Sequence, residues 1–352
     1  MTHTGVGGKK HLATAEARRL AELARAAGLG ESPDEALRWH RDALDLLGTD
    51  EETPLLADVL RWQATVLRDR GRTSEAEPLY QRSLEIAMRL GYDAGRAHAL
   101  NCLGSLALRR GDVNGAANLM TDALMAADQC RETRLIGMLQ QNLGAIADIR
   151  GNPAAALAHY RVSVRTFEST NDLQALSWVL NNLGYLHLKE NRFDDARAVF
   201  ERAIGIARVR GDLMSEGILE ENQAELALTV GNLDDAYESL MRAREVAELR
   251  DDDLRLASAL KLQGAYERLS GRAADATDTL RHALTLSAIT EDALVGAEVL
   301  YQFGLALLAF GDGRGGIEAL KAALEAFDRM GARQWVGKVR QRLTNPDYGR
   351  YL

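Results

Sequence analysis

The sequence predicts an all-α solenoid of about eight helix pairs closed by a C-terminal capping helix, and a 40-residue period is the main evidence. The period is clearest in Trp178–Asn191, where Leu183 precedes Gly184. Steps of 40 residues from this dipeptide reach Leu23-Ala24, Gln63-Ala64, Leu103-Gly104, Leu143-Gly144, Gln223-Ala224, Gln263-Gly264 and Phe303-Gly304. The second residue is always Gly or Ala, so another helix can approach closely at this position.

The second helix of each unit carries three rows of residues in a fixed phase. The first is a small row, at Ala36, Ala76, Ala116, Ala156, Ala196, Ala236, Ala276 and Gly316. The second is large and apolar, at Tyr80, Met120, Tyr160, Phe200, Leu240, Leu280 and Leu320. The third is small again, at Ala43, Ser83, Ala123, Ser163, Ala203, Ala243, Ala283 and Ala323. Spacings of three and four residues put all three rows on one helical stripe, which we expect to be buried.

Starts and stops of the helices also recur. The turn inside each unit is predicted at Gly71, Gly111, Gly151, Asn191, Gly231, Gly271 and Gly311, since Gly and Asn favour the left-handed conformation that ends helices. Carboxylates in one phase, at Glu52, Glu132, Asp172, Asp212, Asp252 and Asp292, are expected to cap the first helices. Ser32-Pro33-Asp34-Glu35 predicts a capping box, and Asn152-Pro153 predicts a second cap followed by proline.

The repeat divides the chain into four segments. We expect a disordered tail over residues 1–11, the solenoid over 12–331, a capping helix over 332–343 and a C-terminal tail over 344–352. The prolines total five and aromatic residues make up 5%, which favours helices with small-residue contacts over sheets.

The two ends of the solenoid are expected to differ from its interior. The first unit turns at Gly28-Leu29-Gly30, slightly out of phase, and should form an N-terminal cap. In the capping helix, Trp335, Val336 and Val339 form the expected buried face, with Lys338 on the exposed face beside three arginines.

Composition argues against several functions. A net charge of −8 and a pI near 5.5 argue against general binding to nucleic acid or anionic membranes. The N-terminus lacks the apolar stretch of a signal peptide, and no run of 18 apolar residues indicates a membrane span, so we expect a cytoplasmic protein. Its basic charge, carried mainly by arginine, is typical of bacterial chains of high-GC coding.

No catalytic, cofactor or metal motif is recognisable. The seven histidines lack metal-binding spacing, and Cys102 and Cys130 are expected to be packing residues. The Gly-rich run over 311–316 lies in a predicted helix–helix turn, and no phosphate-binding loop or nucleophile motif is present. We therefore expect no enzyme, no cofactor and no bound metal.

The rows resemble the tetratricopeptide repeat in its longer form of about 40 residues. The resemblance covers nearly the whole chain, and the triplets Asn142-Leu143-Gly144 and Asn182-Leu183-Gly184 are similar to those of Pins-type adaptors, kinesin light chains and bacterial regulators. It implies a right-handed superhelix whose first helices line a concave groove for peptides or partner helices. A scaffold of this kind serves many unrelated partners, so the fold alone does not name one.

The same resemblance places the groove on the first helices, three residues before and one residue after the Gly/Ala position, and one turn earlier. The residues predicted to bind a ligand there are Arg61, His98, Asn101, Gln141, Trp178, Asn181, Tyr185, Glu221, Glu225 and Lys261. The alternative is that these are solvated helix surfaces. Asn142, Asn182 and Asn222 form a neighbouring row that we expect to tie helices together. A dicarboxylate clamp is not predicted, because Lys261 is followed by Ala265 rather than Asn.

Acidic residues concentrate over 211–253, where thirteen Asp and Glu stand against three Arg. Glu221 and Glu225 are one helical turn apart and share a face. One hypothesis is an acidic pocket that receives Arg or Lys from a partner. The alternative is that Glu221 pairs with Lys261 of the next unit and the other carboxylates only confer solubility.

Three functions remain open. The leading hypothesis is a non-enzymatic scaffold or adaptor that binds a protein or peptide, with basic residues as one feature of that partner. The second is a peptide- or metabolite-sensing regulator that controls a separate effector. The third is self-assembly into a homo-oligomer, with the tail Tyr348–Leu352 docking into a neighbouring groove.

Overall fold

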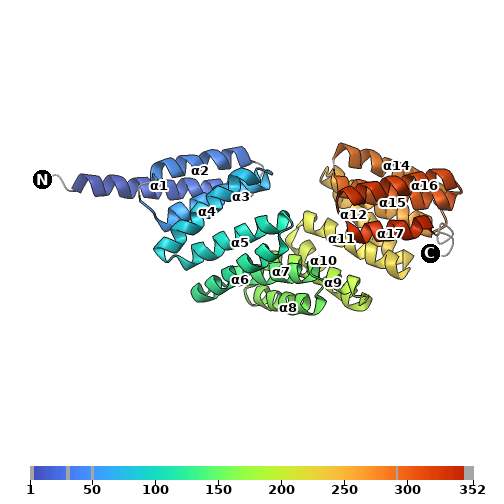
Figure 1. Ribbon diagram of the computed structural model, residues 1–352, viewed down its shortest axis with the longest axis horizontal. Coiled ribbons are helices and arrows are strands. Elements are labelled where there is room, and N and C mark those ends of the chain that lie inside the picture. Colours follow the sequence, from blue (N-terminus) through green and yellow to red (C-terminus); the bar gives the residue numbers. More distant parts are fainter. Residues whose placement is uncertain (1–3, 29–31, 49–50, 291, 345–352) are drawn as a thin grey trace. The chain divides into compact units, whose positions relative to one another are not determined.

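The computed structural model describes residues 4–28, 32–48, 51–290 and 292–344. In this part of the chain, 17 helices follow one another in antiparallel pairs, and within each of two compact units each helix packs against the next (Figure 1). The fold is the all-α solenoid that the 40-residue period predicts. The chain divides into two compact units, Met1–Asp172 and Leu173–Leu352.

The first unit contains four helix pairs. They are α1 (Thr4–Gly28) with α2 (Pro33–Leu47), α3 (Pro54–Asp69) with α4 (Thr73–Leu90), α5 (Asp93–Arg109) with α6 (Val113–Cys130), and α7 (Thr133–Ile149) with α8 (Pro153–Ser169).

The second unit contains four further pairs and a final helix. They are α9 (Leu173–Lys189) with α10 (Phe193–Arg210), α11 (Leu213–Val230) with α12 (Leu233–Leu249), α13 (Asp253–Leu269) with α14 (Ala273–Ile289), α15 (Ala293–Phe310) with α16 (Gly313–Arg329), and α17 (Arg333–Thr344).

Each pair is held together at the Gly/Ala position of its first helix. A Cβ atom added to Gly184 would lie 2.5 Å from Cε1 of Phe200, and one added to Gly144 would lie 2.6 Å from Cε1 of Tyr160. Both rings are buried, so the second helix places a large side chain directly over the bare backbone of the first. The small row beside them, from Ala36 to Ala276, is fully buried as predicted.

Serine takes the place of alanine in the third row without leaving a buried polar group unpaired. The Ser83 hydroxyl donates to the backbone carbonyl of Ala57 at 2.7 Å, and the Ser163 hydroxyl donates to that of Gly137 at 2.8 Å. These bonds tie the second helix of a pair to the first, and they satisfy the hydroxyl as a buried site requires.

The turns between the two helices of each repeat lie where the sequence predicts them. Residues in the predicted row have left-handed φ values, from 56° at Asn191 to 100° at Gly311. Turns between successive repeats use the same conformation, also at residues other than glycine, such as Arg131 and Asp251. Non-glycine residues tolerate it there at a modest energetic cost.

The predicted caps are only partly confirmed. Carboxylates of Asp212, Asp252 and Asp292 accept the expected backbone N–H bonds. By contrast, Glu132 makes no capping bond. Glutamate at this position therefore does not provide the cap that aspartate provides at α11, α13 and α15.

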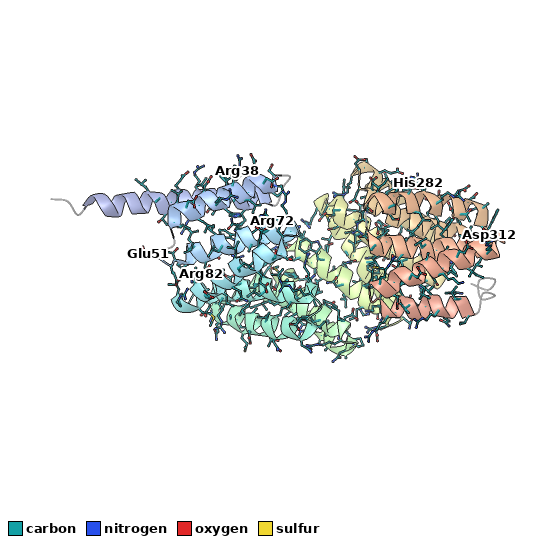
Figure 2. All side chains as sticks on the ribbon, turned by 45° about the horizontal axis from the view of Figure 1, so that its top comes forward. Arg38, Glu51, Arg72, Arg82, His282 and Asp312 are labelled. Carbon is teal, nitrogen blue, oxygen red and sulfur yellow. The ribbon has the colours of Figure 1, made fainter. Side chains whose placement is uncertain are left out.

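At α3 the cap is Thr53, while Glu52 binds Arg82 and Arg89 instead (Figure 2 labels Arg82). The capping box at Ser32 was wrong, because this residue has φ −122° and ψ 56° and its hydroxyl accepts no capping bond. The cap at Asn152 is confirmed, since its side chain accepts from the backbone N–H of Ala155.

The ends of the solenoid follow the prediction more loosely. Helix α1 begins at Thr4, inside the segment 1–11 expected to be a tail, because an existing helix extends by one hydrogen bond per residue at little cost. At the other end α17 closes the last pair: Trp335 stacks on Phe327 at 4.9 Å, and Val339 is fully buried. The tail Tyr348–Leu352, like the turn residues Leu29 and Gly30, lies outside the described residues.

Helix α15 is the one described helix long and apolar enough to cross a membrane. Its residues Tyr301 and Leu305 belong to a core shared with α16 and α17, and Glu298 is ion-paired with Lys261 at 2.5 Å. We interpret α15 as the apolar core helix of the second unit, since a protein core and a bilayer select similar compositions.

The contact at Gly184 gives a direct test of this packing. Gly184→Ala should lower the free energy of unfolding by about 1–3 kcal/mol, because the new methyl overpacks the buried Phe200 ring. The matched control is Gly205→Ala on α10, where an added Cβ meets nothing within 4 Å. It should raise stability by about 0.5–1 kcal/mol through helix propensity.

Chemical denaturation of both variants measures the difference. Equal stability changes in the two variants would contradict the proposed role of Gly184.

Candidate functional site

The residues predicted to line a groove fall into two groups. Arg61, His98, Asn101 and Gln141 belong to the first unit. Trp178, Asn181, Tyr185, Glu221, Glu225 and Lys261 belong to the second unit. Each group is considered within its own unit.

In the first unit, two of the four predicted residues, Arg61 and Asn101, are bonded to neighbouring side chains. Arg61 pairs with Asp58 at 2.8 Å and lies over the Trp62 ring, while Tyr92 donates to the same carboxylate. Burial, reinforced by the positive charge of Arg61, lowers the pKa of His98 to about 4, so this imidazole is neutral at pH 7. The arrangement fits a structural network better than a ligand site.

An asparagine ladder joins neighbouring first helices in both units. The Asn142 amide donates to Oδ1 of Asn101 at 3.1 Å, and the Asn222 amide donates to Oδ1 of Asn181 at 2.6 Å. The expectation that this row ties helices together is confirmed for Asn142 and Asn222. It also means that Asn101 and Asn181 each use one amide atom for the fold.

In the second unit, α9, α11, α13, α15 and α17 line a cavity of about 370 Å³, which we call the polar cavity. Tyr185, Glu221, Glu225 and Lys261 lie together in its lining, as the sequence predicts. Its full lining comprises Tyr185, Glu221, Asn222, Glu225, Leu228, Thr229, Ser258, Lys261, Leu262, Ala265, Arg268, Leu269, Glu298, Gln302, Trp335 and Lys338.

The polar cavity carries both signs of charge. Three carboxylates, from Glu221, Glu225 and Glu298, face three cations, from Lys261, Arg268 and Lys338. Burial raises the pKa of Glu221 and Glu225 and lowers that of Lys338. The purely acidic pocket suggested by the charge run over 211–253 is therefore corrected to a mixed one.

The pairing expected for Glu221 was also wrong. Its carboxylate accepts from the Ser258 hydroxyl at 2.8 Å and lies 3.5 Å from a guanidinium nitrogen of Arg255. Lys261 instead pairs with Glu298 at 2.5 Å. The reason is register, since Lys261 lies one turn beyond Ser258 on α13 and faces α15, the next first helix.

Two acceptors in the polar cavity lack a donor among the described residues. Neither a hydrogen-bond donor nor an ion-pair partner contacts the Glu225 carboxylate within the described ranges. Burial raises its pKa, and the more distant charges of Lys261 and Lys338 offset only part of that rise. The Oε1 atom of Gln302 is buried without a hydrogen bond to any described residue. A bare carboxylate and a bare amide oxygen in one cavity are suited to receive N–H donors.

Trp178 and Asn181 lie in a separate, largely apolar pocket of about 270 Å³ between α9 and α11, which we call the apolar pocket. The Trp178 side chain is 46% exposed. The other residues that line the apolar pocket are Gln174, Ser177, Asp212, Met214, Ser215, Ile218 and Leu219. The sequence grouped Trp178 with Glu221 in one centre, and the structure separates them.

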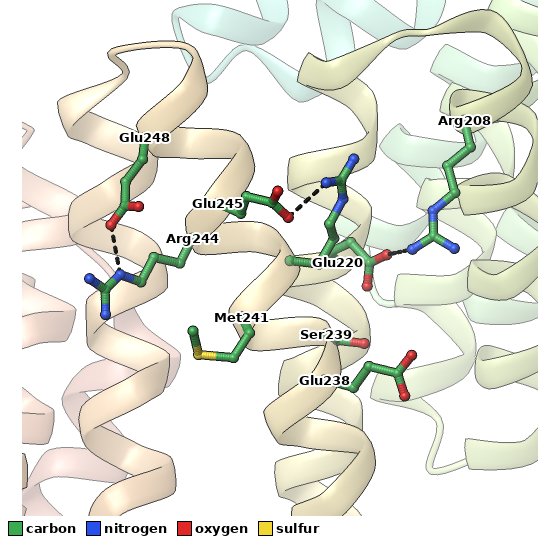
Figure 3. Close-up of a pocket in the computed structure, with 9 residues that line it drawn as sticks. Arg208, Glu220, Glu238, Ser239, Met241, Arg244, Glu245 and Glu248 are labelled. Carbon is green, nitrogen blue, oxygen red and sulfur yellow. Dashed lines mark hydrogen bonds and ion pairs between the residues drawn. The ribbon is translucent and has the colours of Figure 1, made fainter.

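A third hollow, the outer charged pocket, is larger, about 630 Å³, and is lined by α10, α11 and α12. Figure 3 shows Arg208 of α10 bonded to Glu220 of α11, and Arg244 bonded to Glu248 one turn along α12. Arg208 and Arg242 both also bind the buried Glu216. Since these charges are neutralised by one another, we interpret the hollow as a structural ion-pair network.

Sequence reasoning missed several residues of the polar cavity. Gln302 stands in the asparagine row, two residues before Gly304, so its position in the repeat could have identified it. Lys338 is exposed, as predicted for α17, and its ammonium also lies 4.5 Å from the Trp335 ring and lines the cavity. No period could place Lys338 or Trp335, because α17 is not a repeat. Among the described residues, no cluster of three or more His, Cys, Asp or Glu could hold a metal ion.

Comparison with known families places the fold. The tetratricopeptide-repeat model matches residues 55–129 and 135–208. No curated protein matches the sequence significantly.

Solved structures with the same fold are distant in sequence. A signal transduction ATPase with numerous domains from Pyrococcus horikoshii, which has a tetratricopeptide-repeat sensor, is 12% identical with a TM-score of 0.67. The match covers 97% of this chain and 54% of that one. Aspartyl phosphate phosphatase F from Bacillus subtilis is 10% identical with a TM-score of 0.65, covering 93% and 94%.

A Rap protein complexed with competence and sporulation factor is 14% identical with a TM-score of 0.58, covering 96% of this chain and 97% of that one. Likeness at these identities concerns the fold. Together with the family match over residues 55–129 and 135–208 and the paired helices, it shows that this chain has the tetratricopeptide-repeat type of α-solenoid fold.

Proposed function

We propose that the second unit binds a segment of a partner protein or peptide in the polar cavity, with a Lys or Arg side chain directed at Glu225 and Gln302. The observation that carries this proposal is that, among the described residues, no donor bonds to Gln302 Oε1, which is buried, or to the Glu225 carboxylate beside it in the cavity lining. Tetratricopeptide-repeat domains bind proteins and peptides, and the Rap structure has a factor bound to the same fold.

The energetic argument rests on desolvation. Burial raises the pKa of Glu225, which means that the charged carboxylate is less stable in the cavity than in water. A partner's ammonium or guanidinium would supply the missing hydrogen bonds and charge. Charge-assisted bonds of this kind are about twice as strong as neutral ones.

The proposed role is binding without catalysis, in a cytoplasmic protein. A second form of the same role is regulation, in which the bound segment changes a separate effector; sensor and regulator structures of the same fold favour it. Self-assembly through the tail Tyr348–Leu352 would be a third form, in which the partner is another copy of this chain.

A displayed random-peptide library selected on the full chain tests the proposal. Selected peptides should be enriched in Lys or Arg, and Glu225→Gln should weaken their binding about tenfold by removing the charge from the hydrogen bond. The matched control is Glu238→Gln, at an exposed carboxylate in the outer charged pocket. Equal affinity of both variants, measured by fluorescence anisotropy, would refute the proposal.

In the protein without a bound peptide, Glu225→Gln should increase stability, although it weakens peptide binding. Since the folded-state pKa of Glu225 is raised, its carboxylate opposes folding at pH 7, and this cost disappears below the unfolded-state pKa near 4. Glu225→Gln should therefore raise the free energy of unfolding at pH 7, by up to about 1 kcal/mol. The gain over wild type should vanish at pH 4.

Glu216→Gln supplies the contrast. Burial alone would raise the pKa of Glu216, but bonds from Arg242 and Arg208 outweigh it and lower the pKa. Its contribution is present at pH 7 and lost as pH falls, so this variant should destabilise by about 2 kcal/mol at pH 7, less than a fully buried pair because both arginines keep solvent contact. Denaturation curves at both pH values measure the two variants, and a loss of stability in Glu225→Gln would show that this residue is structural.

A further inference from the structure

The apolar pocket is an unexplained feature beside the polar cavity. Trp178 is 46% exposed and Met214 is 55% exposed, and both lie with Ile218 and Leu219 around a volume of about 270 Å³. Aromatic and methionine side chains that remain exposed around a pocket are typical of the anchor sites of interfaces.

The two hollows lie along one strip of the molecule. On α9, Trp178, Asn181 and Tyr185 follow at intervals of three and four residues, so they share a face. On α11, Ile218 and Glu225 are related in the same way. The apolar pocket thus occupies one end of this strip, and the polar cavity the other.

The Asn181–Asn222 hydrogen bond forms the divide between them. Asn181 lines the apolar pocket and Asn222 lines the polar cavity. Their bond, 2.6 Å long, uses the amide N–H of Asn222 and the carbonyl oxygen of Asn181. The NH₂ group of Asn181 and the carbonyl oxygen of Asn222 make no hydrogen bond with other described residues, so the divide offers one donor and one acceptor. A peptide backbone carries the complementary pair.

The spacing of the two hollows sets the length of the segment. Seven residues of helix separate Trp178 from Tyr185, an axial distance of about 10 Å. The polar cavity is also displaced toward α13 by about one helix spacing, about 9 Å, which gives a separation of about 14 Å. An extended chain advances about 3.3 Å per residue, so about four residues span this distance.

We propose that the second unit recognises an extended peptide segment in which a large apolar side chain and a Lys or Arg lie about four residues apart. The apolar side chain enters the pocket at Trp178 and Met214, the backbone crosses Asn181 and Asn222, and the cation reaches Glu225 and Gln302. This inference rests on the proposed function and specifies the motif that the same site takes.

Synthetic peptides of defined spacing test the motif. Fluorescein-labelled, end-blocked peptides carry one Leu or Phe and one Arg in an Ala/Ser background, in both orders and with one to eight residues between their positions. Fluorescence anisotropy measures binding to the full chain. Affinity should peak at a spacing of three to five residues in one order, about tenfold above the extremes of the series.

Variants separate the two contacts. Trp178→Ala should remove the advantage of Leu or Phe over Ala, about tenfold, while the preference for Arg over Ala persists. Glu225→Gln should do the reverse. Phe310→Ala is the control, since Phe310 is 59% exposed and lines neither hollow. Met214→Ser gives a second change in the apolar pocket at an exposed position, and thermal melts verify that each variant is folded.

The possible failures are distinguishable. Affinity that depends on Arg and Glu225 but not on spacing, or a Trp178→Ala variant that behaves as Phe310→Ala does, overturns the bipartite motif and leaves the proposed function intact. Absence of Arg-dependent binding in every peptide overturns both.

Discussion

The structure depends on one repeated contact, in which a large side chain of the second helix covers the Gly or Ala of the first. At Gly184 the Phe200 ring occupies the space where a Cβ would stand. Because this contact sits on one side of each first helix, it fixes the distance within a pair and leaves the opposite side of that helix unused by its partner. Repetition every 40 residues then lines up the unused sides of successive first helices within a unit.

These sides are free to carry polar groups, and the two units use them differently. In the first unit, Arg61 and Asp58 satisfy one another, and the ladder bond to Asn142 takes up part of Asn101. In the second unit, α17 adds Trp335 and Lys338 to the face and lines a cavity in which no residue of the described ranges bonds to the Glu225 carboxylate. Glu216, by contrast, is buried and bound directly by two arginines, whereas no described residue bonds to the half-buried carboxylate of Glu225.

Periodicity predicted what every repeat must share and little else. The contact at Gly184 and the turn at Asn191 follow from the phase, since each is required for two helices to pair. Cap partners could not all be predicted in this way, because Glu52 binds Arg82 and Arg89, 30 and 37 residues away, and sequence spacing carries no such information. The candidate site was half predictable: Glu225 and Trp178 stand in the repeat, but their separation into two hollows and the contribution of α17 arise from tertiary packing.

The central claim is that the half-buried Glu225 carboxylate, which no described residue bonds, is the binding site for a partner's cation. Carbon-13 NMR of glutamate carboxyls, assigned through Glu225→Gln, measures its pKa in the free protein and with a saturating Arg-containing peptide. The account predicts a pKa raised above the ordinary glutamate value in the free protein and a fall on binding, as the guanidinium stabilises the charged form. A pKa at its ordinary value in the free protein, or one that does not move when the peptide binds, would contradict it.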